Sequence, residues 1–86
     1  MKMTNAIRDR LETALTPTVL EVVDDSAAHA GHAGNPGGDG ETHFNVMIRS
    51  QAFAGLSRVA RHRAVHTALG DLMPQIHALS LDLETP

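Results

Sequence analysis

The sequence predicts an α+β fold in which a three-stranded mixed sheet carries its helices on one face. Segments 4–15 and 57–73 repeat apolar residues with the period of an amphipathic helix. Three shorter segments are β-branched or alternate apolar with polar residues, as strands do; they are 18–24, 42–49 and 77–83. This order, with one further short helical turn near 53–56, predicts two layers around a single core.

Length and composition indicate one small domain over residues 1–86. Phe44 and Phe53 are the only aromatic residues, so aliphatic side chains must build most of the core. There is no cysteine, which excludes disulfides and thiol chemistry of the chain's own. The formal net charge of −3 disfavours general phosphate binding.

The N-terminal residues lack the apolar segment of a secretory signal, and no run approaches the roughly 18 apolar residues of a membrane span. We therefore expect a cytoplasmic protein that does not contact membranes, and a monomer or weak dimer when it is alone.

The first helix is expected to begin at Thr4, a good N-cap residue, and to end before Pro17. Its apolar stripe consists of Ile7, Leu11, Ala14 and Leu15. The strand 18–24 follows. Phe44, Val46 and Ile48 then alternate with polar residues in the strand 42–49, so one face of that strand should be buried.

Between these strands lies a loop, residues 26–42, with five glycines and one proline. It contains His29 and His32. A loop of this length is unusual for a hairpin and is typical of a functional or mobile segment.

After the second strand, Phe53 is a candidate core anchor and Gly55 a candidate turn residue. The helix 57–73 should begin at Ser57 and close before Pro74, and Gly70 should weaken its last turn. We expect its inner face to consist of Val59, His62, Val65, Leu69 and Leu72.

Topology predicts where the histidines meet. A strand–helix–strand crossover makes strands 42–49 and 77–83 parallel if they share a sheet, so both begin at the end that carries the loop. If the last strand instead pairs with strand 18–24, it runs antiparallel and again begins beside the loop. Either pairing brings His77, the expected first residue of the last strand, toward His29 and His32.

Two or three converging histidines are compatible with a metal centre, because imidazole is a common metal ligand. A single histidine at a strand start is more often a hydrogen-bonded structural residue. A closed zinc site takes four ligands, and an iron–sulfur cluster normally takes cysteine thiolates, so no complete site is evident in this chain. Two histidines can still complete a cluster held partly by a partner, as histidines ligate one iron in Rieske centres.

The sequence resembles the BolA family along nearly its whole length. Four segments carry the resemblance, in the family's order: "VLEVVDDSAAHAGHAG", "ETHFNVMIRSQAFAGLS", "RHRAVHTAL" and "IHALSLDLETP". The resemblance implies a fold like that of a class II KH domain. The chain lacks a GxxG loop beside its predicted helix 57–73, such as the loop with which KH domains clamp nucleic acid, so the fold does not imply RNA binding.

What the resemblance implies about function is a partnership with a monothiol glutaredoxin in iron–sulfur cluster assembly or iron homeostasis. In such complexes a [2Fe-2S] cluster bridges the two proteins, and the glutaredoxin contributes a cysteine and glutathione. The family's ligands correspond to His77 and to a loop histidine, either His29 or His32. The isolated chain is expected to hold no cofactor.

The alternative function is that of a DNA-binding transcription regulator, since BolA-like proteins are also described in that role. Arg58, Arg61 and Arg63 form a small basic group at the start of the second helix, which is otherwise explained as a solvated helix start.

His62 is expected to be a buried structural residue, and His43 to lie on the sheet face opposite Phe44 as a surface residue rather than a ligand. No nucleophile or paired acid–base carboxylate is evident, so we expect no enzymatic activity.

Overall fold

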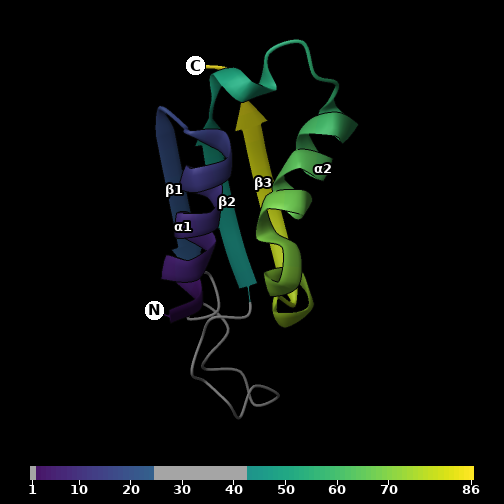
Figure 1. The fold of residues 1–86 in the computed structure, drawn as a ribbon. Coiled ribbons are helices and arrows are strands. Elements are labelled where there is room, and N and C mark those ends of the chain that lie inside the picture. Colours follow the sequence, from purple (N-terminus) through teal and green to yellow (C-terminus); the bar gives the residue numbers. More distant parts are fainter. Residues whose placement is uncertain (1, 25–42) are drawn as a thin grey trace.

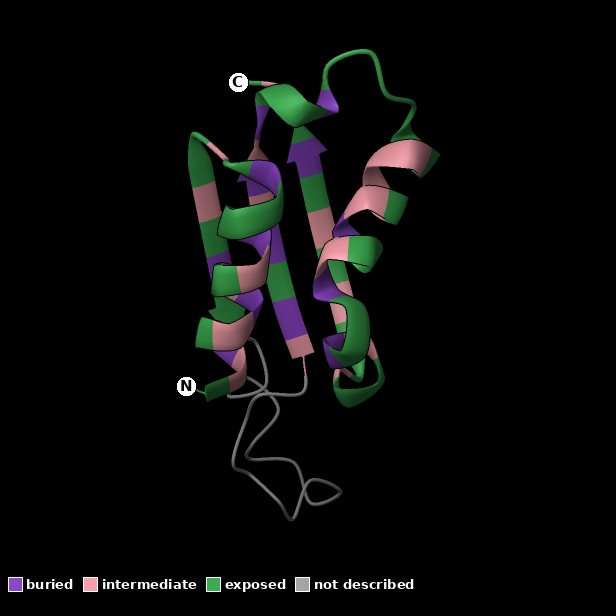
Figure 2. Ribbon diagram, viewed as in Figure 1, coloured by how far each residue is buried: buried purple, intermediate pink, exposed green. Residues whose placement is uncertain are grey.

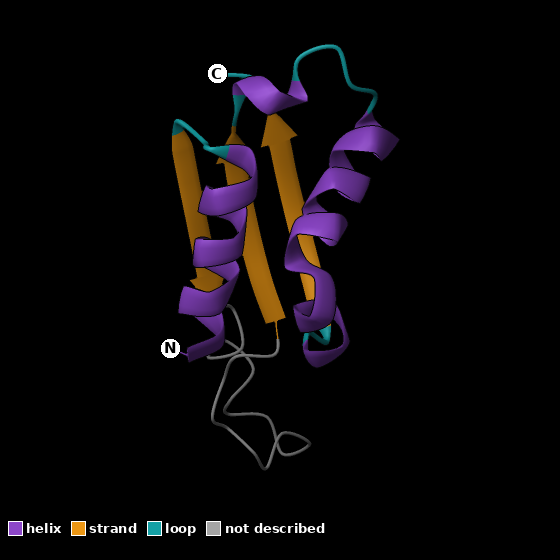
Figure 3. Ribbon diagram, viewed as in Figure 1, coloured by secondary structure: helices purple, strands orange, loops and turns teal. Residues whose placement is uncertain are grey.

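The computed structural model describes residues 2–24 and 43–86. The described residues form two α-helices, two short 3₁₀-helices and three strands, and Figures 1 and 3 show their arrangement. In chain order they are α1 (Lys2–Leu15), β1 (Val19–Asp24), β2 (His43–Arg49), η2 (Gln51–Phe53), α2 (Arg58–Leu69), η3 (Gly70–Gln75) and β3 (Ala78–Glu84). The loop predicted over 26–42, with His29 and His32, lies outside the described residues.

The strands form one mixed sheet in the order β1-β2-β3. β1 pairs antiparallel with β2, whereas β3 pairs parallel with β2 in the register His43↔Ala78 to Arg49↔Glu84. The last strand thus pairs with the second strand and not with the first. Helices α1 and α2 lie side by side over one face of the sheet (Figure 1), which confirms the predicted α+β architecture.

The core lies between the two helices and the sheet, as the purple segments of Figure 2 show. Strand residues on the helix side are buried because alternate side chains of a strand point to opposite faces. The buried apolar residues are Ile7, Leu11, Leu15, Val22, Phe44, Val46, Ile48, Phe53, Val65, Leu69, Leu72 and Leu83. Phe53 is 0% exposed, in the core position expected of it.

Turns and caps fix how the chain enters and leaves the helices. Gly55 has a φ of +77°, a left-handed conformation that glycine adopts without steric cost. Ser57 caps α2, because its hydroxyl accepts a hydrogen bond from the Ala60 N–H at 3.1 Å.

The end of α1 is joined to the sheet by a buried hydroxyl. Ser50 is 0% exposed, and its Oγ donates a hydrogen bond to the Leu15 carbonyl at 2.6 Å while accepting one from the Ala52 N–H at 3.1 Å. The sequence did not predict this role for Ser50, because a hydrogen bond to a residue so distant in the chain leaves no local pattern.

Several predicted boundaries were wrong: β1 begins at Val19, the short helical turn spans Gln51–Phe53 instead of 53–56, and β3 ends at Glu84. Three further differences affect caps and the site. α1 begins at Lys2, so Thr4 lies inside the helix and is not its N-cap. α2 ends at Leu69 rather than at residue 73, because Gly70, with φ +49° and ψ −118°, leaves the α-helical region and a 3₁₀-helix follows. β3 begins at Ala78, so His77 precedes the strand instead of starting it.

A charged contact holds α1 beside the end of α2. Arg10 donates to the Leu69 carbonyl at 3.1 Å and forms an ion pair with Asp71 at 2.9 Å. The hydrogen bond and the charge of Arg10 lower the pKa of Asp71 below its usual value. Because Asp71 is exposed, solvent screens this pair, so it contributes little to the free energy of unfolding.

The predicted inner face of α2 was wrong at its first turn. Val59 is 59% exposed, whereas Val65 and Leu69 are fully buried. Arg61, four residues before Val65, is the side chain that reaches the sheet from this turn. The buried stripe therefore passes through position 61 rather than 59, a shift that periodicity did not reveal because an arginine interrupts the apolar pattern.

We predict that Val65→Ala lowers the free energy of unfolding by about 2 kcal/mol, because it removes two methylene-sized groups from the core. Val59→Ala is the matched control on the same helix. It should be neutral or slightly stabilising, since alanine has the higher helix propensity. Urea denaturation of both variants measures the difference, and equal losses would contradict the observed orientation of α2.

Candidate metal centre at one end of the sheet

The end of the sheet where β2 and β3 begin brings two histidines together. His43 is the first residue of β2 and pairs in register with Ala78, the first residue of β3. His77, immediately before β3, therefore lies beside His43. The centres of the two imidazole rings are 5.0 Å apart and the ring planes are inclined by 58°.

Both rings are accessible from outside. His77 is exposed and His43 is half-buried. A shallow depression of about 210 Å³ is lined by residues that include His43, Asn45 and Ser80. Within the described ranges 2–24 and 43–86, no group of three or more His, Cys, Asp or Glu side chains is placed to hold a metal ion.

The predicted loop ligands, His29 and His32, lie outside the described residues, so their approach to His77 stays a prediction. The chain on either side of that segment is described. Asp24 pairs in register with Phe44, which places the last residue of β1 at the same end of the sheet as His43 and His77. The observed strand directions are therefore those that convergence of the histidines at this end requires.

Sequence reasoning missed the contact between His43 and His77. Strand alternation predicted only that His43 lies on the face opposite Phe44. His77 precedes β3, so alternation within that strand does not fix the direction of its side chain. The signal that was available is the parallel crossover itself, which brings the first residues of two strands to one end of a sheet.

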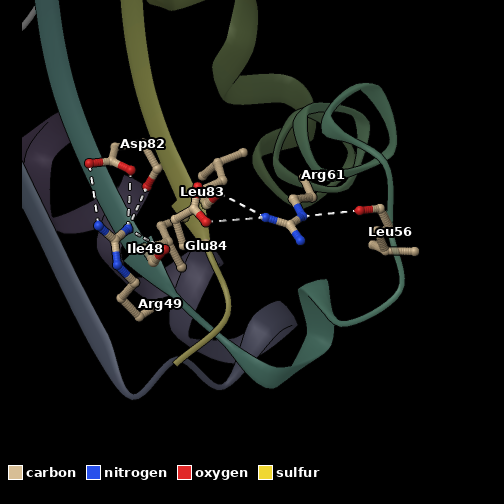
Figure 4. A network of polar contacts seen from close by, with 7 residues as sticks. All are labelled: Ile48, Arg49, Leu56, Arg61, Asp82, Leu83 and Glu84. Carbon is tan, nitrogen blue, oxygen red and sulfur yellow. Dashed lines mark hydrogen bonds and ion pairs between the residues drawn. The ribbon is translucent and has the colours of Figure 1, made fainter.

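The predicted nucleic-acid residues have different environments. Arg61 forms hydrogen bonds within the fold. Its Nε donates to the Leu56 carbonyl at 3.2 Å and its Nη1 to the Leu83 carbonyl at 3.1 Å, as Figure 4 shows. The Arg61 guanidinium also lies 6.0 Å from the centre of the Phe53 ring and 3.8 Å from the Glu84 carboxylate. Arg61 thereby ties α2 to the free edge of β3.

Arg58 and Arg63 are exposed, and within the described part of the chain neither makes an ion pair or side-chain hydrogen bond. A groove of about 560 Å³ between the start of α2 and β3 is lined by Arg58, Arg61 and His62 among others. His62 was expected to be buried but is only half-buried, because its side of the helix borders this groove rather than the core.

A second arginine joins the two parallel strands on the open side of the sheet. Arg49 of β2 forms a paired contact with the Asp82 carboxylate of β3, with Nη1–Oδ1 at 3.2 Å and Nη2–Oδ2 at 3.4 Å (Figure 4). Arg49 Nη1 also donates to the Asp82 carbonyl at 3.3 Å. This contact supports the β2–β3 register, and through it the placement of His43 beside His77.

Comparisons with known proteins identify the class of protein. The family model described as "BolA-like protein" matches residues 11–86. The solved BolA domain of SufE1 from Arabidopsis thaliana superposes with a TM-score of 0.84 at 46% identity, covering 100% of this chain and 94% of that one. The chain therefore belongs to the BolA family, and its fold is the BolA fold.

Several curated relatives are similar to nearly the whole chain. SufE-like protein 1 of Arabidopsis thaliana is 52% identical over 84 residues, 93% of this chain but 23% of that protein. BolA-like protein 1 of Mus musculus is 46% identical over 82 residues, 94% of this chain and 56% of its own length. The DNA-binding transcriptional regulator BolA of Escherichia coli is 36% identical over 86 residues, 99% of this chain and 77% of its own length.

None of the described helices is long and apolar enough to cross a membrane. Relatives include a protein named as chloroplastic or mitochondrial, so the cytoplasmic location stays a prediction. The absence of enzymatic activity stays a prediction as well.

We predict that Arg61→Ala lowers the free energy of unfolding by about 1–2 kcal/mol, because it leaves the carbonyls of Leu56 and Leu83 without their charged donor. Arg63→Ala removes the same charge from an exposed position of the same helix and should change stability by less than about 0.5 kcal/mol. Thermal or urea unfolding of the two variants measures the difference in their free energies of unfolding. Equal stability of both would show that Arg61 is not a structural residue.

Proposed function

We propose that this chain is an accessory protein of iron–sulfur cluster assembly or iron homeostasis. It binds a monothiol glutaredoxin and supplies histidine ligands to a [2Fe-2S] cluster bridging the two proteins. The observation that carries the proposal is the accessible imidazole of His77, held at the end of a sheet in a chain of the BolA family. Membership of that family supports the proposed glutaredoxin partnership.

The donor set of the chain suits a shared cluster better than one of its own. Iron–sulfur clusters are normally held by four protein ligands, mainly thiolates, and this chain has no cysteine. Imidazole ligation of one iron has precedent in Rieske centres. A partner that contributes a cysteine and glutathione would supply the thiolates, and this chain would supply imidazole nitrogens.

His77 is the ligand that we assign to the rigid part of the chain, and a loop histidine is the second. His29 and His32 are separated by only two residues, Ala30 and Gly31, and either is compatible with the family's loop position. Some of the matched relatives are much longer than this chain. The proposal therefore concerns cluster binding by this domain and does not extend to the activities of those longer proteins.

A second candidate function is DNA binding. Two observations favour it: the relative from Escherichia coli is named a DNA-binding transcriptional regulator, and Arg58 and Arg63 are exposed near the start of α2. Arg61 contributes less in this role, since its guanidinium is held by backbone carbonyls. The two functions use different ends of the molecule and are compatible.

We predict that adding this chain to a monothiol glutaredoxin reconstituted with iron, sulfide and glutathione changes the visible absorption and circular dichroism of the cluster. His77→Ala should abolish that change, because it removes an imidazole ligand. His66→Ala, at an exposed position in the last turn of α2, is the matched control and should behave as the unaltered chain.

Comparison of His29→Ala with His32→Ala shows which loop histidine is the ligand. Only the variant that removes the ligand should alter the cluster spectrum. A cluster spectrum that stays unchanged when the unaltered chain is added would refute the proposal. Binding to the cluster-free glutaredoxin is measured separately, so that loss of the partner is distinguished from loss of a ligand.

For DNA, we predict that Arg58→Ala/Arg63→Ala weakens binding to a duplex and reduces the slope of log K against log salt by about 2, as expected when two phosphate contacts are lost. Lys2→Ala/Arg8→Ala removes the same charge from α1 and should leave the slope unchanged. Fluorescence anisotropy at several salt concentrations measures both. Equal slopes for the two double variants would exclude the start of α2 as the contact surface.

A further inference from the structure

Two imidazoles at the starts of neighbouring strands are held near one another by the backbone of the sheet. His43 begins β2, His77 precedes β3, and the pairing His43↔Ala78 sets their separation. We propose that His43 and His77 together bind one divalent first-row transition ion through one ring nitrogen each, without a partner protein. The ion belongs to the class that prefers imidazole nitrogen, of which Cu²⁺, Ni²⁺ and Zn²⁺ are members.

The distance between the rings matches that of two ligands on one ion. An imidazole nitrogen coordinates Zn²⁺ at about 2.0–2.1 Å, which places the ring centre about 3.2 Å from the ion. Two rings separated by about 90–110° at the ion then have centres about 4.5–5.2 Å apart. The measured 5.0 Å between His43 and His77 lies inside this range.

The backbone at this site already has the arrangement that two ligands need. Both residues adjoin the β2–β3 ladder, and the contact of Arg49 with Asp82 joins the same two strands farther along. Binding therefore requires rotation of the imidazoles but no rearrangement of strands. A site on paired strands loses less conformational entropy on binding than one on a loop.

Two protein ligands leave several positions of the ion open. No third His, Cys, Asp or Glu completes a cluster among residues 2–24 and 43–86. Water is a suitable ligand for the remaining positions. We expect modest affinity, with Cu²⁺ bound more tightly than Zn²⁺ as the general order for such donors requires. The exposure of His77 gives the ion a path to the site from solvent.

This inference differs from the proposed cluster site in its second ligand. The cluster proposal pairs His77 with His29 or His32, whereas the ion site pairs it with His43 and needs neither loop histidine. It is tested on the isolated chain. Failure of the glutaredoxin reconstitution leaves the ion site unaffected, and failure of ion binding leaves the cluster proposal unaffected.

The experiment is a titration of the isolated chain with Zn²⁺ alone, observed by the imidazole nitrogen signals of its six histidines in NMR spectra and by calorimetry. We expect the His43 and His77 signals to change together, at one ion per chain, before those of His62 and His66. A Cu²⁺ titration on the same samples should show tighter binding.

Variants separate ligation from packing. His43→Phe keeps an aromatic ring beside His77 but has no nitrogen, so it should preserve the fold and weaken Zn²⁺ binding about tenfold or more. His77→Ala should do the same, whereas the matched control His66→Ala and the double variant His29→Ala/His32→Ala should bind as the unaltered chain does. Circular dichroism verifies that each variant is folded.

Three results would overturn the proposal. They are no Zn²⁺ or Cu²⁺ binding by the isolated chain, unchanged affinity in His43→Phe, and loss of binding in His29→Ala/His32→Ala. The last result would place the ion on the loop histidines. Should His43→Phe fail to fold, the NMR titration of the unaltered chain still decides the matter, because it reports which imidazoles bind.

Discussion

The parallel pairing of β2 with β3 is the constraint on which the rest of the structure depends. It requires a crossover, which α2 and η3 provide, and the crossover places α2 beside α1 on the same face of the sheet. Its register places Ala78 opposite His43, and His77 consequently reaches the His43 ring. A shift of one residue would turn the buried side chains of β3 outward and separate the two imidazoles.

Two arginines stabilise that arrangement from opposite sides of β3. Arg49 joins β2 to β3 through the Asp82 carboxylate, and Arg61 joins α2 to the outer edge of β3 through the Leu83 carbonyl. An edge carbonyl that is bonded to a guanidinium is less available to a strand from another molecule. One of the three arginines that the sequence suggested for nucleic-acid contact, Arg61, is thus used inside the fold, which leaves Arg58 and Arg63 for an external partner.

Two of the histidines considered as ligands, His43 and His77, lie at the end of the sheet. The other two, His29 and His32, lie outside the described residues. His43 begins β2 and His77 directly precedes β3, so the ladder between these strands orients both residues before any partner arrives. As proposed, His77 serves the shared cluster in the complex and, together with His43, an ion in the isolated chain. Both roles depend on the same exposed imidazole, so occupation of the site by a free ion would compete with the cluster for His77.

The sequence by itself determined the fold class, the order of the elements, the core of β2 and the family, because periodicity and motif order are local properties of the chain. It also determined that His77 lies at the loop end of the sheet, since either strand pairing gives that result. Only the tertiary structure decided which strand β3 pairs with, that Arg61 rather than Val59 faces the sheet, and that Ser50 bonds to Leu15. The contact of His43 with His77 belongs to this second group. Each of these depends on residues far apart in the chain, whose proximity follows from packing and hydrogen bonding that no local pattern encodes.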